Sequence, residues 1–224
     1  MSIVIPEVVI YKAINACLTV VKNDWNAKTE KSKTILSYVF RKDDLGNDLN
    51  FNNFNWFEQA QALFIPDAKV KRKLDVHFGY NLTRTTEPSI HIMLPNESPS
   101  AAGIGGNEGY LQGIVDAANN EYIPVYAEHT SVTYQLLVTS NNYNEVLLIY
   151  YFIKALLMSI KNHLELSNFQ NVVFGGNDLV FSQDVIPAGI YHRSINITFT
   201  YDFDSIDILT TKFGTEFTVN SSNS

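Results

Sequence analysis

Cysteine is almost absent from this chain, since one thiol, Cys17, occurs in 224 residues. A lone cysteine excludes a disulfide framework and a cysteine-based metal site within one chain. Cys17 falls in an apolar pattern of helical period, which is typical of a small buried side chain. We therefore predict that Cys17 belongs to the core and is not a nucleophile.

Basic residues are also scarce, with 16 Lys and Arg against 23 Asp and Glu, and the formal net charge is −7. That balance excludes a protein that holds duplex nucleic acid mainly through phosphate contacts. The one basic cluster, within residues 69–73, is typical of a solvated or interface surface. The N-terminus has neither a charged leader region nor a cleavage site, which favours a protein made and kept in the cytoplasm.

Long uninterrupted apolar runs are missing as well. The most apolar segment is 145–166, but Lys154 interrupts it, and Lys161 and His163 close it. A membrane-spanning helix needs about 20 predominantly apolar residues. We therefore expect a buried helix in this segment and not a membrane span.

Motifs for catalysis are absent too. The segment Gly103–Gly109 carries Glu108 where a dinucleotide-binding loop has its third glycine, and the chain has no Gly-Lys-Ser/Thr motif. No known motif surrounds a serine or cysteine nucleophile. We expect no enzyme activity and no cofactor. The alternative is a small-ligand or nucleotide-binding enzyme that uses the Gly103–Gly109 loop.

Two patterns resemble metal sites without completing one. His77, His91 and His192 each fall on the predicted polar face of a strand, so that neighbours across strands can converge on a metal. The acidic run within 202–207 lacks the glycine turn and the distal bidentate glutamate of a calcium loop. We predict solvated or hydrogen-bonded histidines, a charged strand end, and no metal.

What the chain does have is a series of clearly periodic segments. Residues 131–139 and 191–203 alternate apolar and polar side chains, which is typical of strands with one buried face. Between them, 145–166 is apolar on more than one side, and Asn142 with Glu145 predicts an N-cap and a capping box. We expect one side of this helix to pack on the sheet and the other on a second helix or another subunit.

The remaining elements complete an α+β fold. We predict helices from Pro6 to about Trp25, at 34–41 and at 55–64, and further strands at 74–80 and 90–94. The predicted sheet is antiparallel and four-stranded, flanked by helices, with the long apolar helix before the last strand. We expect one domain, 1–212, with insertions at 42–66 and 98–130, and a disordered tail at 213–224. The predicted inaccessible core comprises Leu147, Phe152, Leu156, Ile195, Ile197 and Phe199.

Four segments carry a family resemblance. They are Asn55–Ala62 (NWFEQAQA), Pro88–Glu97 (PSIHIMLPNE), Asn171–Leu179 (NVVFGGNDL), and Pro187 with Tyr191–Arg193 and the alternating strand that follows. In order and composition, they resemble an inserted helix, the second strand with its Leu-Pro-x-Glu exit, the turn after the long helix, and the last strand of tail terminators and related neck proteins of tailed bacteriophages. The resemblance covers most of residues 5–204, and the chain is longer than compact tail terminators at 42–66 and 98–130.

The resemblance implies a structural virion protein that forms a ring, commonly a hexamer, between the head connector and the tail. Its partners would be copies of itself and the neighbouring neck, connector and tail proteins, and packaged DNA would pass through the ring without sequence-specific binding. The segment 98–130 is far longer than an ordinary connection, so we expect it to contact another subunit. The candidate contact residues are Tyr110, Leu111, Ile114, Tyr122, Ile123, Tyr150 and Tyr151. A non-viral oligomeric adaptor is a further alternative.

Overall fold

The computed structural model describes eight stretches of the chain. They are residues 5–40, 50–51, 53–65, 73–79, 87–100, 109–116, 121–177 and 189–206. In 50–51, 109–116, 121–128 and 204–206 the description covers the backbone alone. The predicted disordered tail at 213–224 lies outside the described residues, as does the glycine-rich loop up to Glu108.

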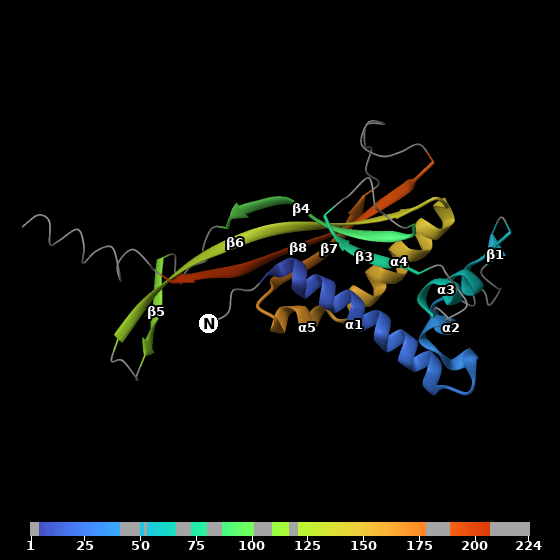
Figure 1. The fold of residues 1–224 in the computed structure, drawn as a ribbon, viewed down its shortest axis with the longest axis horizontal. Helices are drawn as coiled ribbons and strands as arrows, with labels where there is room; N and C mark the ends of the chain where they lie inside the picture. The colour runs from blue at the N-terminus through green and yellow to red at the C-terminus, as the bar shows by residue number, and fades with distance from the viewer. Residues whose placement is uncertain are drawn as a thin grey trace, which may run out of the picture.

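Helices and strands alternate in an α+β order (Figure 1). The helices are α1 (Pro6–Ala27), a short 3-10 turn η1 (Lys31–Lys33), α2 (Ile35–Phe40), α3 (Trp56–Phe64), α4 (Tyr143–Ser159) and α5 (Lys161–Leu166). The strands are β1 (Asn50–Phe51), β2 (Phe54–Asn55), β3 (Asp75–Phe78), β4 (Ser89–Pro99), β5 (Gly109–Asp116), β6 (Glu121–Ser140), β7 (Gln170–Asn177) and β8 (Tyr191–Ile206). The predicted α+β class is therefore confirmed.

The main sheet is mixed, which corrects the predicted four-stranded antiparallel sheet. Its strand order is β3-β4-β6-β8-β7, and β5 pairs with β6 beyond that path. All pairs are antiparallel except β3 with β4, where Val76 lies opposite Ile90 in parallel register. Alternation along a strand shows that one face is buried, but it carries no information on the direction of the neighbouring strand. The prediction missed β7 because its Gly175-Gly176 pair resembled a turn.

The predicted long helix at 145–166 is also wrong in detail, because two helices occupy that segment. Ile160, with ψ of 12°, ends α4 and precedes α5, and the Ser159 hydroxyl donates to the Leu156 carbonyl at 2.6 Å. Such a side-chain bond competes with the helical ladder. Strand β7 then separates these helices from β8. No helix among the described residues has the length and apolar character needed to cross a bilayer.

The ends of the helices follow local sequence signals. Pro6 opens α1, as predicted, and the Asn142 side chain caps α4 by accepting from the Asn144 amide at 3.0 Å. At the predicted capping box, the Asn142 amide donates to the Ser140 hydroxyl at 3.1 Å, and the Glu145 carboxylate accepts from that hydroxyl. That bond ties the end of β6 to the start of α4, so it fixes the angle at which the helix leaves the sheet.

The core lies between α4 and the long strands β6 and β8 (Figure 1). Phe199 is stacked between Phe169, with ring centroids 4.0 Å apart, and Tyr134, at 5.8 Å. Four residues of the predicted core are buried, but Leu147 and Leu156 are only partly buried. The buried face of α4 comprises Val146, Leu148, Ile149, Tyr150, Phe152, Ile153 and Leu157. The helix is apolar almost all round, so its sequence did not define which stripe faces inward.

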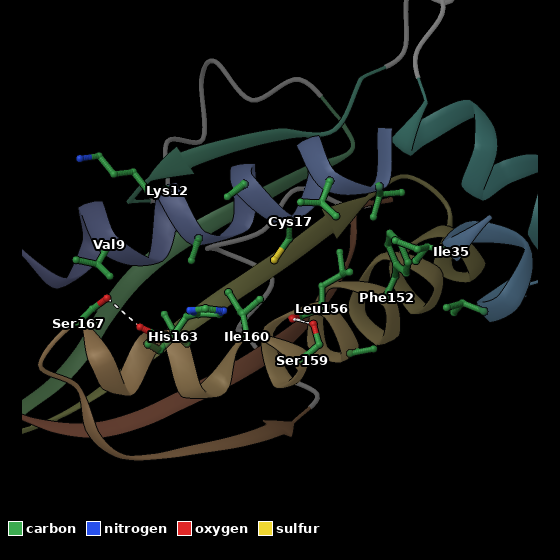
Figure 2. Close-up of a pocket in the computed structure, with 17 residues that line it drawn as sticks. Val9, Lys12, Cys17, Ile35, Phe152, Leu156, Ser159, Ile160, His163 and Ser167 are labelled. Carbon is green, nitrogen blue, oxygen red and sulfur yellow. Dashed lines mark hydrogen bonds between the residues drawn. The ribbon is translucent and has the colours of Figure 1, made fainter. Parts of the chain in front are cut away.

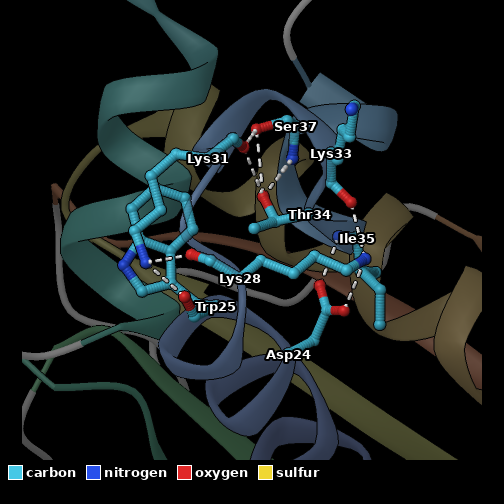
Figure 3. A network of polar contacts seen from close by, with 8 residues as sticks. All are labelled: Asp24, Trp25, Lys28, Lys31, Lys33, Thr34, Ile35 and Ser37. Atoms are coloured by element: carbon cyan, nitrogen blue, oxygen red, sulfur yellow. Dashed lines mark hydrogen bonds and ion pairs between the residues drawn. The ribbon is translucent and has the colours of Figure 1, made fainter.

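A polar network fixes the corner between α1 and α2 (Figure 3). The Asp24 carboxylate accepts from the Ile35 amide at 2.7 Å and pairs with Lys28 at 2.7 Å. The hydrogen bond with Lys28 is the largest cause that lowers the pKa of Asp24, and the Ile35 amide acts in the same direction. Lys31 donates to the Trp25 carbonyl and lies 5.0 Å from that ring's centroid. The corner thus holds α2 against the C-terminal end of α1.

The excursion at 98–130 is not a loop in its described parts, which corrects that prediction. Residues 109–116 form β5, and 121–130 form the outer half of the long strand β6. The insertion at 42–66 likewise contains α3 and the small β1–β2 hairpin. Figure 1 shows β5 and the outer ends of β6 and β8 extending past the helices as an arm. We call the paired segments 109–116 and 121–128 the arm.

Candidate assembly surfaces

An open apolar groove lies between α1 on one side and α4 and α5 on the other (Figure 2). Its volume is about 920 Å³. One wall is formed by Val9, Ala13, Ala16 and Val20 of α1. The opposite wall includes Ala155, Leu156, Ile160 and Leu164. Helix α2 adds Ile35 and Val39 to the lining of the groove. The alanines Ala13 and Ala16 of α1 and Ala155 of α4 are too small to fill the space between these helices, so the groove stays open.

Polar groups are few in this groove. Cys17 is buried on the α1 side, and burial raises the pKa of its thiol, so it stays protonated and unreactive near neutral pH. The prediction of a buried Cys17 is confirmed. Lys12 and His163, both exposed, stand at the edge of the groove on opposite helices. The groove is therefore an apolar surface with a cationic side chain and a histidine at its rim.

The arm gathers five of the seven candidate contact residues. Tyr110, Leu111 and Ile114 lie on β5, and Tyr122 and Ile123 lie on the facing part of β6. Ile114 is opposite Ile123 in the register, and a shift between Leu111 and Ile114 interrupts the pairing. The backbone thus brings together residues that the sequence placed in one irregular excursion.

Tyr150 and Tyr151 belong to a separate site on α4. Tyr150 is only 4% exposed, which corrects its prediction as a contact residue, whereas Tyr151 is 56% exposed. The Arg193 guanidinium of β8 lies 4.6 Å from the Tyr150 ring and 5.6 Å from the Tyr151 ring. Cation–π attraction of this kind fixes the arginine against both rings. No local pattern predicted this contact, because Arg193 of β8 is distant in the chain from both tyrosines of α4.

One of the three strand histidines, His91, takes part in a buried polar network. His91, fully buried on β4, donates from Nδ1 to the Gly79 carbonyl at 3.0 Å, and its Nε2 lies 2.9 Å from the Ser89 hydroxyl. Ser89 lies 2.8 Å from the Thr139 hydroxyl, which donates to Glu87 at 3.1 Å. Buried polar groups need such partners.

Metal-binding groups do not converge in the described part of the chain. No group of three or more histidine, cysteine, aspartate or glutamate residues there has the geometry to hold an ion. His77 stacks on His91 with centroids 5.5 Å apart, while His192 is opposite Thr139 on another strand. Asp202 of the acidic run pairs with His129 at 2.7 Å, and Asp207 lies outside the described residues.

The His91 network predicts a pH dependence of stability. Burial lowers the pKa of His91 below the ordinary 6.5, with the nearby His77 acting in the same direction and the Gly79 hydrogen bond opposing it. Between the two pKa values the unfolded chain binds more protons than the folded chain. The free energy of unfolding should therefore fall as the pH drops through 6.5 towards the folded-state pKa of His91.

Urea denaturation over roughly pH 5 to 8 measures this effect. The slope should persist in His163→Gln, which removes an exposed histidine, and weaken in His91→Asn. An unfolding free energy of the wild type that does not change across this range would contradict the prediction.

The fold and these surfaces define an α+β protein whose mixed sheet carries a helical layer with an open apolar groove. No protein-family model matches the chain, and a search of curated proteins gives no significant match. The groove and the arm are therefore the features from which a function can be inferred.

Proposed function

We propose that this chain is a structural virion protein with a tail-terminator-like fold, forming a ring in the phage neck that joins the head connector to the tail. The observation that carries the proposal is a pair of unlike surfaces, the apolar groove and the arm. A subunit in a closed ring contacts its two neighbours through two different surfaces, because ring contacts are heterologous. The family resemblance in 55–62, 88–97, 171–179 and 187–203 supports the same conclusion.

The partners follow from this role. The chain would assemble with copies of itself, commonly six, and with the proteins of the adjacent connector and tail layers. A formal net charge of −7 suits a ring through which packaged DNA passes, because like charge disfavours its retention. The ring would be assembled in the host cytoplasm and would remain in the virion.

The test is direct observation of the assembly. We expect light scattering coupled to size-exclusion chromatography to give a mass several times the 25.3 kDa of the chain. Negative-stain images should show closed rings, and the protein should be present in purified particles. A monomer that binds a nucleotide at Gly103–Gly109 with a Kd of about 1 μM would instead support the enzyme alternative. If the chain forms a stable oligomer but is produced by cells that carry no phage genes, the result would support the non-viral adaptor.

A further inference from the structure

The negative charge of this protein is concentrated in one part of the chain. Between Arg84 and Lys154 there is no lysine or arginine, while that segment carries seven acidic residues. These seven equal the whole net charge of −7, so the rest of the chain is balanced. The segment includes β4, β5 and β6, and therefore the arm, together with the first part of α4. The arm carries three of these acidic residues, Asp116, Glu121 and Glu128, and its sequence also contains tyrosine, isoleucine, leucine and valine.

The register places like charges together at the tip of the arm. Asp116 at the end of β5 is directly opposite Glu121 at the start of β6. Like charges in opposed positions destabilise a strand pair. Among the described residues, the β8 register ends at Ile206 opposite Val125, and beyond Val125 the described pairing of the arm is β5 with β6. A two-stranded hairpin is marginally stable by itself, so an apolar and cationic partner would stabilise this tip.

The groove is apolar and has a cationic side chain at its rim, as a partner for the tip of the arm requires. Its walls are apolar, and the exposed Lys12 and His163 stand at its rim. The α1 wall from Val9 to Val20 is roughly 17 Å long at 1.5 Å per helical residue. That length accommodates roughly five residues of extended strand. The tip segments 114–116 and 121–123 are within this size.

We propose that the tip of the arm in one copy of the chain binds in the groove of the next copy. Asp116 and Glu121 would lie near Lys12, and the apolar residues beside them in β5 and β6 would cover the alanine-rich walls. The contact joins two different surfaces, so its repetition builds a ring when the rotation between successive copies closes. This inference rests on the proposed ring function and names the contact that builds the ring.

Charge-swap variants test the pairing. Lys12→Glu and the arm variant Asp116→Lys/Glu121→Lys should each raise the concentration at which half of the chains are assembled by about 100-fold, because like charges would then meet. The combination of all three changes should restore assembly to within about tenfold of the wild type. The matched control is Lys22→Glu, which makes the same change at an exposed position of α1 outside the groove lining and should leave assembly unchanged.

Cross-linking tests the location directly. In a Cys17→Ala background, Ala155→Cys marks the groove and Ile123→Cys marks the arm. Mixed chains that each carry one of these cysteines should form disulfide-linked heterodimers on mild oxidation. Rings that assemble normally with Lys12→Glu and yield no heterodimer would overturn this inference while leaving the ring function intact. A wild-type chain that stays monomeric at every concentration and is absent from particles would overturn both.

Discussion

Replacing Phe199 with alanine is expected to lower the free energy of unfolding by about 3–5 kcal/mol. Phe199 is 1% exposed and lies in the middle of β8, stacked on Phe169 at 4.0 Å with an interplanar angle of 13°. Tyr134 stacks on it from β6 at 5.8 Å. The substitution removes a large apolar side chain and leaves a cavity that this rigid stack cannot fill.

Urea denaturation at constant pH measures the change. Phe203→Ala is the matched control, because Phe203 lies on the same strand but is 40% exposed. Its cost should stay within about 1 kcal/mol. Similar losses from both variants would show that the stack formed by Phe199 is not the centre of the core.

The second large effect is expected at Gly176 on β7. A Cβ atom there would overlap the Tyr150 hydroxyl and lie 2.8 Å from Cζ of that ring. Tyr150 is held between buried neighbours and the stacked Arg193, so it has little room to move. Gly176→Ala should therefore cost about 1–3 kcal/mol of stability, as overpacking usually does.

Gly175→Ala provides the control for this prediction. At that position the nearest atom to an added Cβ is Asn196 Cβ at 3.8 Å, an ordinary contact. The same denaturation experiment should give a loss for Gly176→Ala that Tyr150→Leu largely removes in the double variant. Equal losses from the two glycine variants would mean that strand propensity, and not the tyrosine, limits this position.

Local chemistry explains what could be predicted about the fold. Pro6 and Asn142 mark the starts of α1 and α4, and both signals act within one helical turn. The alternation of β8 predicted Ile195, Ile197 and Phe199 as core residues because a strand has a fixed period of two. These properties depend on neighbours in sequence, so the sequence alone contains them.

The candidate surfaces were only partly predictable. The apolar pattern of helical period around Cys17 was visible in the sequence, but the role of Val9, Ala13, Ala16 and Val20 as a groove wall depends on how far α4 and α5 lie from α1. The arm residues were predicted to contact another subunit, while their pairing as strands was not predicted. No local sequence pattern predicted the contact of Arg193 with Tyr150 and Tyr151.

Periodicity and capping are short-range effects, so they were sufficient to predict the α+β class, the burial of Cys17 and the core face of the last strand. The parallel pairing of β3 with β4, the break at Ile160 and the burial of Tyr150 depend on contacts between distant segments and became visible in the folded chain. Strand direction and strand neighbours are set by contacts between residues far apart in the chain, and many registers share the same alternating pattern. The groove and the arm also depend on the tertiary structure. The groove is formed by the spacing between α1 and the pair α4 and α5, and the arm is formed by the pairing of β5 with β6.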